Sequence, residues 1–211
     1  MRLFHAPGSP YARIARMAVI ELGLEDRVTV TETTLRDPAS DLLPYNPLGR
    51  VPALLLPGGI TVTETTPVLM MLDALVEPAR RLLPGPERPG LLAAYGRALG
   101  FIDGIAVWNR ELRRPACERS PGVIALEEAR AERAADALEA DVRDGGFACR
   151  DAGWLALVSA LGYCERRHTA FAWGKGRPAL RALFEAAAGR PCVARTVPPA
   201  GMGSAAPALS R

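Results

Sequence analysis

Ser9, near the start of the chain, is the first residue whose type and position suggest chemistry. It precedes Pro10 and a run of helical apolar spacing, in the stretch HAPGSPYARIAR of residues 5 to 16. Serine is a preferred N-cap residue and proline a preferred first helical residue, so the pair predicts the start of a helix. The N-terminal end of a helix favours an anion. Ser9 is therefore either only a helix cap or a hydroxyl that takes part in chemistry.

Two more short stretches combine polar residues with special backbone positions. In NPLGRVPAL, Val51 precedes Pro52, and X-Pro bonds are the one place where cis peptides are common. Taken alone, this stretch is a loop with a solvated arginine, Arg50. Further on, Glu64-Thr65 opens a predicted helix, which taken alone is an ordinary helix start with an acidic residue.

Cysteine and histidine spacing gives no support for a metal site or a redox centre. There is no CxxC and no Cys/His pair with zinc-finger spacing. The four widely spaced cysteines are predicted to be reduced and mostly buried: Cys117, Cys149, Cys164 and Cys192. His5 and His168 have no partner at catalytic spacing, so no role is assigned to them.

Charge and hydropathy point away from nucleic acid and from membranes. The net charge is only +3, and the basic residues are scattered rather than clustered. The N-terminus lacks a signal pattern, and no uninterrupted apolar run approaches the length of a membrane span. We therefore expect a cytoplasmic protein.

The elements that must position these residues form two groups. Residues 1–78 predict a thioredoxin-like βαβ-ββα domain, because short β-type and helical patterns alternate there. The expected elements are a strand at 1–6, a helix at 10–23 ending at Gly23, a strand at 27–35, a hairpin at 51–63, and a helix at 63–75 that begins with hydroxyl caps.

A proline- and glycine-rich linker at 79–90 then separates an all-α helical-bundle domain at 91–211. Its predicted helices cover 91–114, 122–144, 151–168 and 176–189. Asp151 is the predicted N-cap of the third, but Trp154 stands where a capping box would have its second member. The tail from about residue 198 is small and proline-rich and is expected to be poorly ordered.

Four stretches in this order make the chain resemble the cytosolic glutathione S-transferases. They are SPYARIAR, YNPLGRVPAL, Glu64-Thr65, and ALGYCERR followed by GRPALRALFEAAAGRPC. The resemblance covers nearly the whole chain. It is strongest to small bacterial members that carry serine in an SPY or SPF motif.

The resemblance implies that Ser9 is the catalytic residue. A thiol of ordinary pKa is only a few per cent ionised at neutral pH, and thiolate is the nucleophile. The hydroxyl of Ser9, together with the helix N-terminus, would stabilise the thiolate of glutathione. Relatives of glutaredoxin type carry a nucleophilic cysteine at this position, and its absence here disfavours a thiol oxidoreductase.

The same resemblance assigns the other ends of glutathione. A cis Val51-Pro52 bond would turn the Val51 backbone toward the cysteinyl residue, and Arg50 would bind the glycyl carboxylate. Glu64 and Thr65 would hold the ammonium and the carboxylate of the γ-glutamyl residue. The family usually has serine where this chain has Thr65, which keeps the hydroxyl.

Residues of the helical domain are expected to complete the site. Asp103 would reach the γ-glutamyl amine, either in its own or in the partner subunit, unless it is a solvated helix residue. Tyr11, Phe101, Trp108 and Tyr163 would line an apolar electrophile pocket. Aromatic residues at helical spacing are more often core residues, which is the alternative for Phe101, Trp108 and Tyr163.

These expectations describe a transferase that adds glutathione to an apolar electrophile. Glutathione would be a co-substrate, with no permanently bound cofactor and no metal, and the chain would be a homodimer. The alternative is a glutathione-transferase-like binding or regulatory protein with little turnover, since binding does not prove catalysis.

Overall fold

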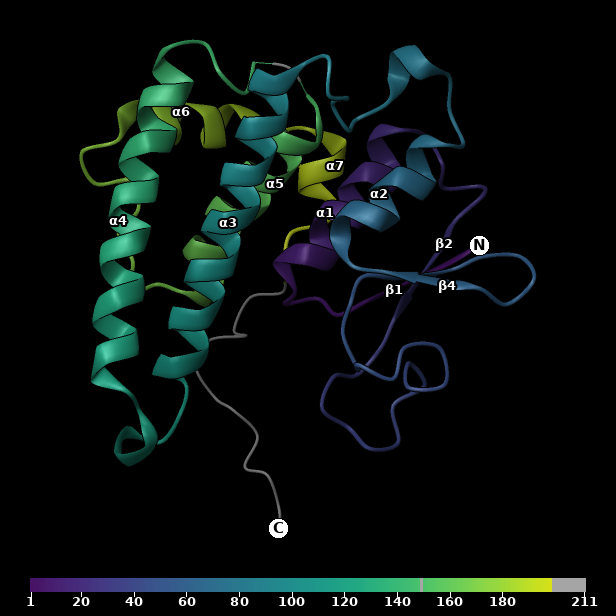
Figure 1. Cartoon of the computed structure of the whole chain (residues 1–211), viewed down its shortest axis with the longest axis horizontal. Helices are drawn as coiled ribbons and strands as arrows, with labels where there is room; N and C mark the ends of the chain where they lie inside the picture. Colours follow the sequence, from purple (N-terminus) through teal and green to yellow (C-terminus); the bar gives the residue numbers. More distant parts are fainter. Residues whose placement is uncertain (149, 199–211) are drawn as a thin grey trace.

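A small sheet with two helices lies beside a bundle of longer helices in the computed structural model, which describes residues 1–148 and 150–198 (Figure 1). The N-terminal elements are β1 (Arg2–His5), α1 (Pro10–Glu21), β2 (Thr29–Glu32), β3 (Ala53–Leu55), β4 (Thr61–Thr63) and α2 (Thr65–Asp73). The strand order is β2-β1-β3-β4, with β1 and β2 parallel and the other pairs antiparallel. The predicted thioredoxin-like fold is confirmed.

The alternation of side chains along β1 explains how this sheet buries both faces. Leu3 and Phe4 are fully buried but belong to two different apolar clusters. Leu3 packs with the core that includes Ile14 and Leu69, whereas Phe4 packs with a smaller cluster that includes Val51. Successive strand residues point to opposite faces, so one short apolar strand serves both sides.

The helical region contains α3 (Pro89–Leu112), α4 (Pro121–Arg143), α5 (Ala152–Arg167), α6 (Pro178–Ala187) and α7 (Pro191–Ala194). Asp151 caps α5 as predicted, because its Oδ1 accepts from the backbone N–H of Trp154 at 3.1 Å. The short helix α7 was not predicted, since four residues carry too little periodicity to be seen. The predicted disorder of the tail from about 198 falls almost wholly outside the described residues.

Helix α3 is also long and apolar enough to span a bilayer, by length and composition, and among the described residues no other helix passes that test. The sequence reading above found no such segment. In the structure α3 packs against both α4 and α5, and its buried residues include Ile102, Ile105 and Trp108. A core helix of a helical bundle gives the same apolar signal.

Packing of α1 against α5 and α7 fixes the junction between the two regions. The Ser159 hydroxyl on α5 donates to the carbonyl of Pro10 at 2.8 Å. Arg13 on α1 is buried, and its Nε donates to Thr196 Oγ1 at 3.3 Å. The start of α1, where Ser9 lies, is therefore held directly against the helical region.

Candidate functional site

Ser9 is the N-cap of α1, as predicted. Its Oγ accepts a hydrogen bond from the backbone N–H of Ala12 at 3.2 Å, and its own N–H donates to Ala6 O at 3.0 Å. Capping uses the hydroxyl as an acceptor only, so its hydrogen can be donated to another group. Ser9 is half-buried, at the positive end of a 12-residue helix.

The Val51-Pro52 peptide bond is cis, which confirms that expectation. Asn46 shapes the preceding loop, because its Nδ2 donates to Arg50 O at 2.8 Å and its Oδ1 accepts from the N–H of Leu48 at 3.2 Å. Val51 is buried, whereas the side chain of Arg50 is exposed.

Glu64 and Thr65 lie where β4 passes into α2. Glu64 has φ 68° and ψ 150°, a backbone conformation that non-glycine residues rarely adopt and that often marks a functional position. The predicted hydroxyl cap is wrong, because Glu64 is the N-cap of α2 and no side chain caps it. Thr65 is buried, and within the described ranges its Oγ1 has no hydrogen-bond partner.

The register of the sheet brings these three stretches to the same end of the strands. Phe4 of β1 pairs with Ala53 of β3, and Ala53 pairs with Thr63 of β4. The chain leaves β1 toward Ser9, enters β3 from the cis bond, and leaves β4 into Glu64-Thr65. Each of the three stretches therefore lies within a few residues of the row formed by Phe4, Ala53 and Thr63.

Tyr11 and Asp103 connect this edge to the helical region. The Tyr11 hydroxyl donates to Asp103 Oδ1 at 2.5 Å, joining α1 to α3. Burial and this contact with the carboxylate raise the pKa of Tyr11, so its phenol stays protonated at neutral pH. Asp103 is predicted to bind the γ-glutamyl amine. In this structure its Oδ1 accepts a hydrogen bond from the Tyr11 hydroxyl of the same chain.

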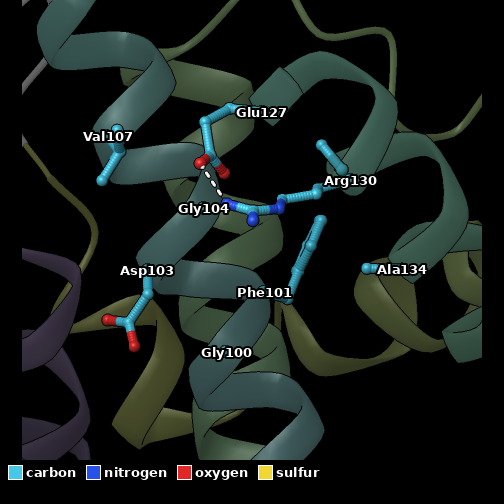
Figure 2. Close-up of a pocket in the computed structure, with 9 residues that line it drawn as sticks. Gly100, Phe101, Asp103, Gly104, Val107, Glu127, Arg130 and Ala134 are labelled. Atoms are coloured by element: carbon cyan, nitrogen blue, oxygen red, sulfur yellow. Dashed lines mark hydrogen bonds and ion pairs between the residues drawn. The ribbon is translucent and has the colours of Figure 1, made fainter. Parts of the chain in front are cut away.

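Phe101 and Trp108 are both buried in the main core cluster, and Phe101 also lines a pocket. Trp108 packs edge-on against His168, with ring centroids 4.2 Å apart, and both lie against Phe171. Phe101 lines a pocket of about 340 Å³ between α3 and α4, beside the Glu127–Arg130 ion pair of 2.7 Å (Figure 2). In that view Asp103 points away from the ion pair.

Ser159 and Arg167 bring α5 to the residues beside Ser9, and neither of them was singled out in the sequence analysis. The guanidinium of Arg167 lies over Gly8, since a Cβ built on Gly8 would stand 2.8 Å from Arg167 Cζ. The hydroxyl of Tyr163 accepts from Asn109 Nδ2 at 2.6 Å. Ser159, Tyr163 and Arg167 recur every four residues, which shows that they share a face but not that this face meets α1.

Among the described cysteines, Cys117 is exposed, whereas Cys164 and Cys192 lie in the core. No group of three His, Cys, Asp or Glu side chains in the described part of the chain is placed to hold a metal ion. Cys164 and Cys192 are buried, and burial raises the pKa of both thiols, that of Cys192 to about 11. Both therefore stay protonated at neutral pH, which makes them poor nucleophiles.

A thioredoxin-like domain followed by a helical region matches the glutathione S-transferase fold. Residues 8–75 match the family model for the glutathione S-transferase N-terminal domain. The uncharacterized GST-like protein YibF of Escherichia coli K12 is 28% identical over 203 residues, which cover 94% of this chain and 99% of YibF.

Solved structures agree with this match over the whole fold. A glutathione S-transferase of Methylobacillus flagellatus with glutathione bound has a TM-score of 0.86 and 25% identity, over 94% of this chain and 99% of that one. A glutathione transferase family member of Pseudomonas fluorescens Pf-5, also with bound glutathione, has a TM-score of 0.84 and 29% identity, over 94% and 98%. Together these matches support the glutathione S-transferase family, by a family model over the N-terminal domain and by relatives over nearly the whole chain.

Proposed function

We propose that this protein binds glutathione at the sheet edge and transfers it to an electrophile, with Ser9 as the catalytic residue. The observation that carries the proposal is the position of Ser9: its hydroxyl caps α1 as an acceptor, and its hydrogen is left for a second partner. The relatives solved with glutathione bound support the choice of ligand.

Thiolate stabilisation would supply the main chemical effect. A sulfur anion placed before Ser9 accepts the hydroxyl hydrogen and lies at the positive end of α1. Each unit by which the thiol pKa falls requires about 1.4 kcal/mol of preferential stabilisation of the anion. The thiol proton leaves to solvent, the thiolate forms a carbon–sulfur bond, and the leaving group of the electrophile departs with its bonding electrons.

The proposal gives each remaining group of the tripeptide a partner at the same end of the sheet. The Val51 backbone would pair with the cysteinyl residue, and Arg50 would neutralise the glycyl carboxylate. Glu64 would meet the γ-glutamyl ammonium. The γ-glutamyl carboxylate would accept from the start of α2 and from the Thr65 hydroxyl, which is buried without a partner in the described ranges.

Tyr11 would act as a positioned neutral hydroxyl and not as an anion. Its raised pKa keeps the phenol protonated, and its hydrogen is directed to Asp103. This leaves Ser9 as the hydroxyl that the proposal assigns to sulfur.

The test is a comparison of Ser9→Ala with Ser120→Ala, because Ser120 caps α4 through its side chain in the same way. Each variant should lose roughly 1 kcal/mol of stability with its cap. Only Ser9→Ala should also lower glutathione ionisation, followed by thiolate absorbance, and conjugation to 1-chloro-2,4-dinitrobenzene, by about tenfold to a hundredfold.

Glutathione affinity, measured by calorimetry, should be largely kept in Ser9→Ala. Unchanged conjugation in that variant would refute the catalytic assignment. Binding of glutathione by the wild type without turnover of any electrophile would favour a regulatory protein instead.

The proposal includes a homodimer. It rests on the resemblance to the family, whose members pair the N-terminal domain of one subunit with the helical domain of the other. Light scattering should give twice the 22.5 kDa chain mass, and a monomer at micromolar concentration would contradict this part of the proposal.

A further inference from the structure

The first turn of α2 is not held by a side-chain cap of its own. In the described part of the chain, the N-cap Glu64 makes no capping hydrogen bond, and its φ of 68° lies in the left-handed region. Pro67 has no N–H, so the backbone donors at the start of α2 are those of Thr65 and Thr66. The direction of these donors therefore depends on contacts from outside α2.

Tyr95 of α3 makes such a contact. Its hydroxyl oxygen lies 2.8 Å from Thr66 Oγ1, and either hydroxyl is able to donate the hydrogen bond that joins them. Tyr95 is only 3% exposed, and a Cβ built on Gly153 of α5 would stand 3.3 Å from the backbone nitrogen of Tyr95. The close approach of α5 therefore fixes Tyr95, and Tyr95 holds Thr66.

A second hydrogen bond connects α3 to the other end of the proposed site. The Tyr11 hydroxyl of α1 donates to Asp103 Oδ1 at 2.5 Å. Asp103 lies about two turns, or roughly 12 Å, beyond Tyr95 along α3. Helix α3 therefore links the first turns of α1 and α2, where the proposed function places the sulfur and the γ-glutamyl residue of glutathione.

We propose that Tyr95 is a positioning residue for the γ-glutamyl end of glutathione. The inference rests on the proposed function, because it concerns how that site holds its ligand. With Thr66 held in place, the two N–H groups keep one direction, and so does the buried Thr65 hydroxyl, which has no partner within the described ranges. All three are then ready to donate to the γ-glutamyl carboxylate. Without the Tyr95 hydroxyl, the ligand must order this turn as it binds, which lowers its affinity.

The binding test removes either hydroxyl of the hydrogen bond and keeps the shape of the side chain. Tyr95→Phe and Thr66→Val should each weaken glutathione binding by about threefold to tenfold in calorimetry, the effect of one hydrogen bond. The double variant should bind about as weakly as either single variant, because both changes remove the same interaction. If the two losses multiplied, the residues would not act through their hydrogen bond, and the inference would fail.

Thr196→Val is the matched control, because its hydroxyl also joins the two regions of the chain, by accepting from Arg13 Nε at 3.3 Å. It should lower the unfolding temperature and keep the wild-type affinity. All variants are measured well below their unfolding transitions, so that a loss of stability alone leaves the affinity unchanged. Thr66 is half-buried, so Thr66→Val decides the question even if Tyr95→Phe does not fold.

The kinetic test separates positioning of the γ-glutamyl end from chemistry at sulfur. In Tyr95→Phe and Thr66→Val, KM for glutathione should rise by the same factor as the dissociation constant. Because Ser9 is untouched, kcat with 1-chloro-2,4-dinitrobenzene and the thiol pKa of bound glutathione should keep their wild-type values. A lowered kcat with an unchanged KM would contradict the assigned role.

The two proposals fail in different ways. If the wild type binds glutathione and both single variants bind it equally well, Tyr95 does not position the ligand, and the proposed function still stands. If the wild type does not bind glutathione, the proposed function itself fails, and this inference fails with it.

Discussion

At the residue scale, the proposed site contains three hydroxyl groups that differ in the hydrogen bonds they already make. Ser9 Oγ is engaged as an acceptor by its own helix, and Tyr11 donates to Asp103. Thr65 Oγ1 is buried and makes no hydrogen bond within the described ranges. A buried polar group without a partner costs free energy, so its persistence is better explained by a ligand than by stability.

Replacing Thr65 with valine tests this explanation. Thr65→Val removes a hydroxyl but keeps the shape, so the free energy of unfolding should stay the same or rise. Glutathione affinity should fall by about tenfold, as for the loss of one hydrogen bond to a carboxylate. Chemical denaturation and calorimetry measure the two effects.

Thr196→Val is the control, because the Thr196 hydroxyl donates to Cys192 O at 2.6 Å. That variant should lose roughly 1 kcal/mol of stability and keep its affinity. Thr65→Val with unchanged affinity would remove Thr65 from the proposed site.

At the element scale, the close packing of α1 against α5 determines where the start of α1 lies. Gly162 of α5 faces the buried guanidinium of Arg13, and an added Cβ would collide with Arg13 Nη1. Arg13 in turn reaches Thr196 Oγ1, just beyond α7. A small residue at 162 is therefore what lets the helices approach and keeps Ser9 at the junction.

We predict that Gly162→Ala lowers the free energy of unfolding by about 1–3 kcal/mol, the usual cost of overpacking a core. Gly96→Ala is the matched control on α3, where an added Cβ meets nothing within 4 Å. It should stabilise the protein by up to about 1 kcal/mol through helix propensity. Denaturant titration measures the free energy of unfolding of both variants. Equal changes in the two would show that α1 and α5 do not pack this closely.

At the scale of the whole molecule, both histidines are buried, and both have pKa values lowered to about 4. Burial is the main cause for each, and Arg16 adds to it for His5. An unfolded histidine titrates near pH 6.5, so between that pH and about 4 the unfolded chain binds protons that the folded chain excludes. Acidification through this window therefore favours unfolding.

Stability should fall by about 1.4 kcal/mol per pH unit for each histidine as the pH drops from 6.5 toward 4. Since the chain has only two histidines, His5→Gln and His168→Gln should each remove about half of this slope. Urea unfolding at several pH values measures it. A slope in the double variant equal to that of the wild type would show that carboxylates alone cause the acid sensitivity.

Local signals in the sequence determined the elements and the candidate edge of the site. Alternating β-branched residues, helix caps and Pro-Gly turns predicted the order of strands and helices, and Ser9-Pro10 predicted the start of α1. Val51-Pro52 was correctly expected to be cis. These features depend on residues a few positions apart, whose effects on the backbone are nearly independent of the rest of the fold.

Only the tertiary structure decided which helix faces meet. Tyr11 and Asp103 are 92 positions apart, and Arg167 at the end of α5 lies over Gly8, near the start of the chain. Periodicity shows that a helix has an apolar face but not what packs against that face. The spacing of Phe101 and Trp108 was therefore compatible both with a pocket and with the core. The sequence alone thus defined a serine-capped helix at the edge of a thioredoxin-like sheet. Long-range packing decided that Asp103 of α3 and Ser159 of α5 meet the first turn of α1, because shape and buried area across the whole core fix those contacts.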